Sequence, residues 1–370
     1  MFILLPSSGA ARQISKPLDL KPLPWKPRDC YEEIRELNSG SEGKTSLVKS
    51  TTTDRVFVVK QTHTIRANRC TAASSYKPTP REAHLLLEVL RPHQNIVKMF
   101  GCEVFNLQTK NIYFAYCSGD DLTDQIEHFS KNKMYAPEAF VLHVCIELVQ
   151  ALAYLHWGLR WNDFEKSWSR DRKHIRIVNG DAKCDNVFLD WAQSSTCPGL
   201  PRVVFGDLGL AQPAETFRGI AGTETYEAPE IVKVTELRRT DPAAFDRITG
   251  YTGFMTPATD VYSLGIVLHM VATLRTHKSG ADPYADGHME GRARVGVRLP
   301  SKYMTVGLNA AIQKCLCVEP SGRPEMTMDP MKGFLQTVDD FRRARARLLS
   351  CGSPIPTKIW ARPPGRKLRE

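Results

Sequence analysis

The stretch that decides the fold is Val178-Asn179-Gly180-Asp181-Ala182-Lys183-Cys184-Asp185-Asn186-Val187-Phe188-Leu189-Asp190. It places an Asp, a Lys and an Asn at i, i+2 and i+5, ahead of a short apolar run. Such a loop can hold the carboxylate of Asp181 for a hydroxyl proton, the ammonium of Lys183 for a phosphate and the amide of Asn186 for a metal. The D-x-K-x-x-N spacing is weak evidence by itself, so its meaning depends on the sequence around it.

A second carboxylate follows at Asp207, in Asp207-Leu208-Gly209, directly after the apolar run 203–205. Two carboxylates, a Lys and an Asn are the groups that phosphoryl transfer requires, because that chemistry depends mostly on positioning and on neutralising charge around Mg²⁺.

The N-terminal part of the chain predicts strand, Gly-rich turn and strand. Gly40 and Gly43 lie in the turn, and the apolar strand 56–60 ends at Lys60, whose ammonium needs an anionic partner. A phosphate-binding P-loop is rejected because its first Gly would fall at Asn38, and because a strand rather than a helix follows. The remaining alternatives are a glycine-rich loop closing over phosphates and an ordinary hairpin turn.

Residues 81–90 show helical periodicity that stops before Pro92. Glu82 on this helix is the first candidate to pair with Lys60 and Glu88 is the second, although a solvated helix-face carboxylate is the commoner fate of a Glu. After two more strands, Ala115 and Cys117 lie at the start of a connector that leads into helices.

Composition indicates an ordinary globular protein of 370 residues with a formal net charge of +10. Nine of the Lys and Arg residues lie in residues 341–370 beside one acid, Glu370, so the basicity belongs to the C-terminal tail.

The ten cysteines show no metal-binding spacing, which favours reduced thiols. We found no pattern for a signal peptide or a membrane span, and therefore expect an intracellular protein, cytoplasmic or nuclear.

Taken together, these motifs resemble the eukaryotic protein kinase family, serine/threonine type, over roughly residues 31–340. The matches occur in family order: the glycine-rich loop, Lys60, Glu82, Asp181-x-Lys183-x-x-Asn186, Asp207-Leu208-Gly209, Ala228-Pro229-Glu230, Asp260 and Arg323. The resemblance implies an α+β, two-lobed fold with a small antiparallel sheet lobe (31–117) and a larger, mostly helical lobe (118–345). Residues 1–30 are expected to form a disordered leader, and residues 346–370 a basic disordered tail.

The resemblance also implies a role for each matched residue, with ATP and Mg²⁺ as cofactors and a protein as substrate. Asp181 and Lys183 would be catalytic, and Asn186 and Asp207 would bind the metal. Glu230 and Arg323 would form a structural ion pair. ATP would be bound by Gly40, Gly43, Lys60 (paired with Glu82), and by Ala115 and Cys117 at the hinge.

Two departures from the family pattern bear on regulation and activity. Asn179-Gly180 stands where the family has His-Arg, so the cation that receives a phosphate on the activation loop is lost, although Thr216, Thr223 and Thr225 are present. Asn38 replaces the first Gly of the phosphate lid. Neither change removes a group that touches the metal or the transferred phosphate.

Two other functions remain open from the sequence. A pseudokinase scaffold would bind nucleotide without turnover, and Asn38 and Asn179-Gly180 favour it. Asn-Gly-Asp also resembles the loop of aminoglycoside- and choline-type kinases, a hypothesis that gains if the insertion 231–258 caps a small acceptor. The roles of the insertions 158–174 and 231–258 are open, and nucleic acid is expected to contact only the basic tail, if anything.

Overall fold

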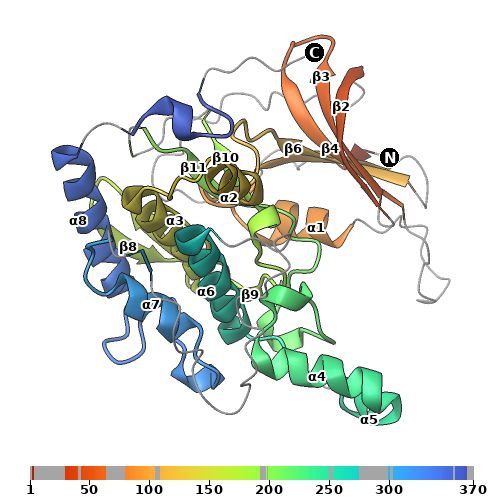
Figure 1. Ribbon diagram of the computed structural model, residues 1–370. Helices are drawn as coiled ribbons and strands as arrows, with labels where there is room; N and C mark the ends of the chain where they lie inside the picture. The colour runs from red at the N-terminus through yellow and green to blue at the C-terminus, as the bar shows by residue number, and fades with distance from the viewer. Residues whose placement is uncertain are drawn as a thin grey trace. The chain divides into compact units, whose positions relative to one another are not determined.

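A computed structural model describes residues 2–3, 30–40, 43–63, 80–104, 109–191, 197, 199–249, 253–274, 299–300, 303–352 and 355–364 (Figure 1). The chain divides into two compact units. The first comprises Met1–Pro92, Val97–Tyr116 and Leu368–Glu370, and the second comprises His93–Ile96 and Cys117–Lys367.

The first unit is built on one antiparallel sheet whose strand order is β1-β5-β6-β4-β3-β2. Its alternating apolar residues form a small core of Val48, Phe57, Val59 and Tyr113. Tyr31 packs edge-on against Phe57, with ring centroids 5.8 Å apart. The strands are β1 (Phe2–Ile3), β2 (Tyr31–Gly40), β3 (Gly43–Ser50), β4 (Val56–His63), β5 (Met99–Val104) and β6 (Thr109–Ala115).

One helical segment accompanies this sheet, and it changes type along its length. It begins as α1 (Arg81–His84) and continues as one π-helical turn, η1 (Leu85–Val89), in which the Leu90 N–H donates to the Leu85 carbonyl. The sequence predicted a helix here but not the wider turn. Short π-helical turns interrupt the regular α-helical ladder and recur at functional sites.

The second unit is organised around α3 (Glu138–Trp157), whose residues 139–156 are all buried. By length and composition α3 could cross a membrane, but its apolar window is wholly inside the protein, as expected of a core helix. Its neighbours include α6 (Pro257–Thr273) and α8 (Leu335–Cys351). The other helices include α2 (Leu122–Lys131), α4 (Pro229–Thr240), α5 (Pro242–Thr249) and α7 (Leu308–Cys315).

Two short antiparallel ladders shape the loops of this unit. β10 (Val187–Asp190) pairs with β11 (Arg202–Phe205), and β9 (Ile177–Val178) pairs with β12 (Gln212–Pro213). The segment Val178–Asp190 therefore runs from one ladder into the other, and its central residues form the loop between them.

Both insertions have regular structure. The first forms a hairpin of β7 (Leu159–Asn162) and β8 (Ser167–Arg170), in which the indoles of Trp161 and Trp168 lie 3.8 Å and 5.0 Å from the guanidinium of Arg342 on α8. The second forms α4 and α5, which contact each other in the lower part of Figure 1. Over its described residues, neither insertion is an unstructured loop.

The predicted tail differs from the structure. α8 continues past residue 345 to Cys351, and Trp360 is only 3% exposed. The disorder prediction from residue 346 is therefore wrong for residues 346–352 and 355–364. The segment is basic and Pro-rich, which favoured the prediction of disorder. The single large aromatic side chain of Trp360 is enough to hold it on the protein. Of the predicted leader, β1 is described, and residues 4–29 lie outside the described residues.

Candidate active site

In the first unit, Lys60 and Glu82 form an ion pair. Lys60 is in β4 and Glu82 is in the first turn of α1, and their Nζ and Oε2 atoms lie 3.1 Å apart. Glu82 is only 4% exposed, so its charge requires a partner. Glu88, the second candidate, instead lies 3.1 Å from His84 on the surface.

Gly40 and Gly43 face each other at the tip of the β2–β3 hairpin. Gly43 has a φ of 141°, and a Cβ built on it would lie 1.9 Å from the carbonyl oxygen of Gln61 in β4. A side chain at position 43 is therefore excluded by the neighbouring strand. The close approach of the two strands therefore requires glycine at position 43, whatever the loop binds.

In the second unit, the loop before Asp181 is held by a buried carboxylate on α6. Asp260 accepts hydrogen bonds from the backbone N–H groups of Asn179 (2.7 Å) and Gly180 (2.9 Å). Its Oδ2 atom also lies 2.9 Å from Nε2 of His156, the penultimate residue of α3. These contacts tie the loop to two core helices and fix the backbone on which Asp181 stands. The sequence offered no signal for His156.

Asp181 lies at the centre of a compact polar network. Its Oδ1 accepts a hydrogen bond from the Thr223 hydroxyl (2.8 Å), and its Oδ2 lies 2.9 Å from Nζ of Lys183. Lys183 also donates to Thr223 Oγ1 at 3.0 Å. Asn186 Nδ2 donates to the backbone oxygen and to Oδ2 of Asp181, both at 3.0 Å. The three residues of the D-x-K-x-x-N pattern thus converge, and Thr223 joins them from the segment before Ala228-Pro229-Glu230.

Asn186 and Asp207 lie at the same end of the β10–β11 ladder. Val187 pairs with Phe205, and the Gly206 N–H donates to the Asn186 carbonyl at 2.9 Å. Asp207 follows with an exposed side chain and a φ of 48°.

This pair fits Mg²⁺ because both residues offer hard oxygen ligands. The Asn186 amide nitrogen is engaged by Asp181, which leaves its oxygen to face a metal. No cluster of three or more His, Cys, Asp or Glu that could bind a metal occurs in the described residues.

The segment after Asp207 folds back over the loop through Phe217. This ring is 1% exposed, and a Cβ at Gly180 would lie 3.3 Å from its Cζ atom. Gly180 has a φ of 79°, a conformation that favours glycine. The apolar ring therefore packs beside the position where the resembled family has Arg. Sequence reasoning did not identify Phe217.

Cys184 and Cys117 are both buried. Burial raises the pKa of each thiol to about 12, which keeps it protonated and unreactive at neutral pH. The Cys184 backbone N–H donates to the Tyr226 hydroxyl oxygen at 3.3 Å. Ala115, the last residue of β6, is anchored by its N–H to the Lys98 carbonyl at 2.9 Å.

Glu230 and Arg323 form the expected ion pair. Arg323 Nη1 and Nη2 donate to the two carboxylate oxygens at 2.6 Å and 2.7 Å. The same guanidinium donates to the carbonyls of Cys317, Val318 and Ala258. All five N–H donors of a buried Arg can be satisfied by such a set, so this pair stabilises the second unit.

Comparison with known proteins agrees with this geometry. A family model described as protein kinase domain matches residues 31–330. Human serine/threonine-protein kinase Nek2 is 25% identical over 337 residues, covering 88% of this chain and 64% of Nek2. G2-specific protein kinase nim-1 of Neurospora crassa is 25% identical over 316 residues, which are 80% of this chain and 32% of nim-1. Ovarian-specific serine/threonine-protein kinase Lok of Drosophila melanogaster is 25% identical over 353 residues, which are 94% and 65% of the two chains.

The chain spans less than two thirds of the length of each of these relatives. The family match nevertheless covers most of this chain and includes the Lys60, Asp181 and Asp207 motifs. This chain belongs to the protein kinase domain family.

Proposed function

We propose that this protein is a serine/threonine protein kinase that transfers the γ-phosphate of ATP to hydroxyl groups of protein substrates with the help of Mg²⁺. One observation carries the proposal: Asp181, Lys183, Asn186 and Thr223 meet in one network at the end of a rigidly held loop. A scaffold that only binds nucleotide has no need of this arrangement.

In the proposed reaction, Asp181 orients the substrate hydroxyl and accepts its proton. Its carboxylate already accepts hydrogen bonds from Thr223 and Asn186, which hold it in one orientation. Lys183 lies 2.9 Å from Asp181 and supplies positive charge to the phosphoryl group as it moves. Thr223 contacts both groups and thereby holds the acid–base group and the cation side by side.

The residues proposed to contact the nucleotide are those that the resemblance implied. Lys60, held by Glu82, contacts the phosphates, while Gly40 and Gly43 bring backbone N–H groups close to them. Ala115 and Cys117 contact the adenine. Asn186 and Asp207 hold Mg²⁺, which when bound neutralises charge on the phosphates.

The alternative of a small-molecule kinase lacks a specific observation in its favour. The insertion 231–258 forms α4 and α5, and α4 begins within Ala228-Pro229-Glu230 and is tied to Arg323 through Glu230. This links the insertion to the core of the second unit. For cellular location, we propose an intracellular protein, in the cytoplasm or the nucleus.

The test is Mg²⁺-dependent transfer of labelled γ-phosphate to a generic protein acceptor, followed by identification of the labelled amino acid. We expect label on Ser or Thr with the wild type. Asp181→Asn and Asp207→Asn should each lower the rate by at least about 100-fold. Asp185→Asn is the matched control because Asp185 is an exposed carboxylate in the same loop, and it should leave the rate within about twofold.

ATP binding without transfer, under any divalent cation, would replace this proposal by the pseudokinase scaffold. Transfer to an aminoglycoside or choline, with none to protein, would replace it by a small-molecule kinase.

A further inference from the structure

The C-terminal segment 355–364 is tied to the connector 117–121, the stretch that leads into α2. The Arg362 side chain pairs with the carboxylate of Asp120. The Arg362 carbonyl also accepts a hydrogen bond from the Trp191 indole N–H at 2.7 Å. All of these residues belong to the second unit. The protein kinase family match ends before this segment begins, so the family pattern does not include the contact.

The same connector packs closely on β10. The Gly119 N–H donates to the Leu189 carbonyl at 2.7 Å, and the Leu189 N–H donates to the Asp120 carbonyl at 2.8 Å. A Cβ built on Gly119 would lie 2.7 Å from the same Leu189 oxygen, so position 119 requires glycine. The backbones of the connector and of β10 are therefore held together by two reciprocal hydrogen bonds.

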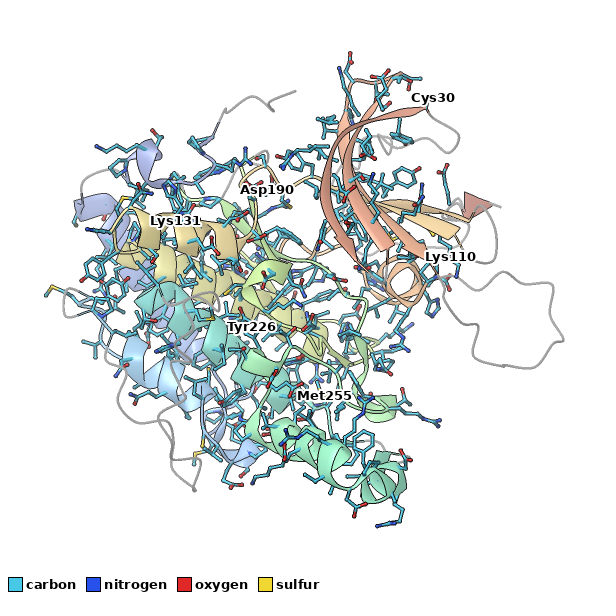
Figure 2. All side chains as sticks on the ribbon, turned by 45° about the vertical axis from the view of Figure 1, so that its right-hand side comes forward. Cys30, Lys110, Lys131, Asp190, Tyr226 and Met255 are labelled. Atoms are coloured by element: carbon cyan, nitrogen blue, oxygen red, sulfur yellow. The ribbon has the colours of Figure 1, made fainter. Side chains whose placement is uncertain are left out.

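The end of β10 contacts both the connector and the C-terminal segment. Asp190, the last residue of β10, is labelled in Figure 2. The backbone N–H of the next residue, Trp191, donates to Ser118 Oγ at 3.2 Å, while its indole donates to the Arg362 carbonyl. Arg362 is thus linked to the connector twice, directly through Asp120 and indirectly through Trp191.

Asp120 has a backbone conformation that most residues avoid. Its φ is 60°, in the left-handed region, which few residues other than glycine adopt, although Asp tolerates it better than most. Other conformations of the connector therefore compete with this one. A partly buried cation that pairs with the Asp120 carboxylate raises the population of the conformation in which the pair can form.

The connector lies next to two of the proposed ligand-binding positions. It begins with Cys117, proposed above to contact the adenine. The strand on which it packs, β10, begins directly after Asn186, which is proposed to bind Mg²⁺. A change in the connector would therefore move Cys117 relative to the strand that follows Asn186.

We propose that Arg362 is a positioning residue for the nucleotide, and that it acts through Asp120 by holding the connector in the conformation that binds. This inference rests on the kinase function proposed above. When only one conformation binds, the apparent Kd equals the intrinsic Kd divided by the fraction of the protein in that conformation. Saturating nucleotide draws the whole population into it, so Arg362 affects nucleotide affinity and leaves kcat unchanged.

The experiment uses the full chain, with Kd for Mg²⁺·ADP from isothermal titration calorimetry, and KM for ATP and kcat from transfer to a protein acceptor. Arg362→Gln should raise Kd and KM for ATP about tenfold and leave kcat at saturating ATP within about twofold. Arg362→Lys, which keeps the charge, should bring Kd to within about threefold of the wild type. The control is Lys358→Gln, which removes an exposed cation of the same segment and should keep the wild-type values.

A double variant tests whether Arg362 acts through Asp120. Asn, like Asp, tolerates positive φ, so Asp120→Asn removes the charge and keeps the backbone preference. Asp120→Asn should raise Kd at least as much as Arg362→Gln, and the double variant should bind no more weakly than Asp120→Asn alone. Additive increases in the free energy of binding would show that Arg362 acts by another route and would overturn the proposal.

An unchanged Kd in Arg362→Gln would also overturn it, as would a fall in kcat with KM for ATP unchanged, which is the result of a general loss of structure. Nucleotide binding does not require transfer. A wild type that binds Mg²⁺·ADP and transfers nothing would therefore contradict the proposed function, while the Kd values of the variants would still decide the role of Arg362. A wild type that binds no nucleotide would overturn both.

Discussion

At the scale of single residues, the position of Asp181 is set by its neighbours more than by its own place in the chain. Thr223, Lys183 and Asn186 all contact its carboxylate, and Thr223 comes from 42 residues away. A carboxylate that is held in one rotamer loses little entropy when it meets a substrate hydroxyl. Under the proposed function, its hydrogen bonds would therefore contribute to catalysis as well as to folding.

Thr223→Val tests this arrangement because it keeps the shape and removes the hydroxyl. Asp181 and Lys183 each lose one hydrogen bond, so we expect kcat to fall by about 10-fold to 100-fold, with KM for ATP unchanged. Thr223→Ser, which retains the hydroxyl, should recover most of the rate. Steady-state kinetics on a protein acceptor distinguish the two, and equal rates for Val and Ser would contradict the bridging role.

His143 predicts how stability depends on pH. It is 1% exposed, its Nε2 lies 2.7 Å from the Pro201 carbonyl and its Nδ1 lies 2.5 Å from Nη1 of Arg345. Burial, followed by the charge of Arg345, lowers its pKa from 6.5 to about 3. The folded pKa is below the unfolded one, so the stabilisation is complete above pH 6.5 and is lost as pH falls toward 3.

Between pH 7 and pH 5 this histidine should lower the free energy of unfolding by about 2 kcal/mol. Burial raises the pKa of the nearby Glu147, which contributes with the opposite sign as the pH falls. The measurement is therefore a comparison of urea unfolding of the wild type and His143→Gln at both pH values. The variant should lose less stability on acidification; an equal loss in both proteins would show that His143 is not the group responsible.

At the scale of elements, Phe217 packs beside the position where the resembled family has a cation. Position 180 is Gly, so no cation stands there to receive a phosphate on the following segment. Phe217 is instead buried against Gly180. β12 pairs with β9 just before it. We therefore expect apolar packing of Phe217, together with the hydrogen bonds of Thr223, to hold this segment without phosphorylation.

Phe217→Ala should therefore lower kcat for a protein acceptor more than about tenfold, since burial of an aromatic ring is worth about 3–5 kcal/mol. Phe217→Leu, which fills much of the same space, should retain most of the activity. Thr216→Ala should leave the rate within about twofold because Thr216 is exposed beside Phe217. Loss of activity in Thr216→Ala, or after phosphatase treatment of the wild type, would contradict a packing-based mechanism.

The same residues show what the sequence could predict. Asp181, Lys183 and Asn186 are within six positions of each other, so their spacing alone brought them to one loop, and the Lys60–Glu82 pair followed from a strand and the next helix. The contacts of His156, Asp260 and Phe217 join residues that lie 37 to 104 positions apart in the chain. Such contacts leave no local periodicity, and Phe217 looks like any other apolar residue until the segment is folded.

At the scale of the whole molecule, the segment 355–364 packs on helices of the second unit that lie far from it in sequence. Trp360 packs on Phe129, Phe140 and Trp191, with ring centroids 6.3, 5.0 and 5.4 Å away. Gln125 on α2 brackets it, donating to the Ile359 carbonyl at 3.2 Å and accepting from the Ala361 N–H at 2.9 Å. Composition suggested disorder here because the segment 355–364 is rich in Pro and carries two basic residues, and Trp360 is its one aromatic residue.

Two further contacts extend this closure. The Trp191 indole N–H donates to the Arg362 carbonyl at 2.7 Å, and Arg362 pairs with Asp120 in the loop before α2. The segment therefore covers aromatic residues of α2 and α3 that would otherwise face solvent. Its loss should affect the stability of the second unit as a whole, since both helices belong to that core.

Trp360→Ala should lower the free energy of unfolding of the second unit by about 3 kcal/mol, within the range for removing a buried Trp side chain. Lys358→Ala is the matched control, since Lys358 is exposed two residues away, and it should shift the free energy by less than about 0.5 kcal/mol. Differential scanning calorimetry would give both values from the same full chain. Identical unfolding transitions for the two variants would mean that the segment rests on the surface without stabilising it, and that the aromatic side chains of α2 and α3 are buried without its help.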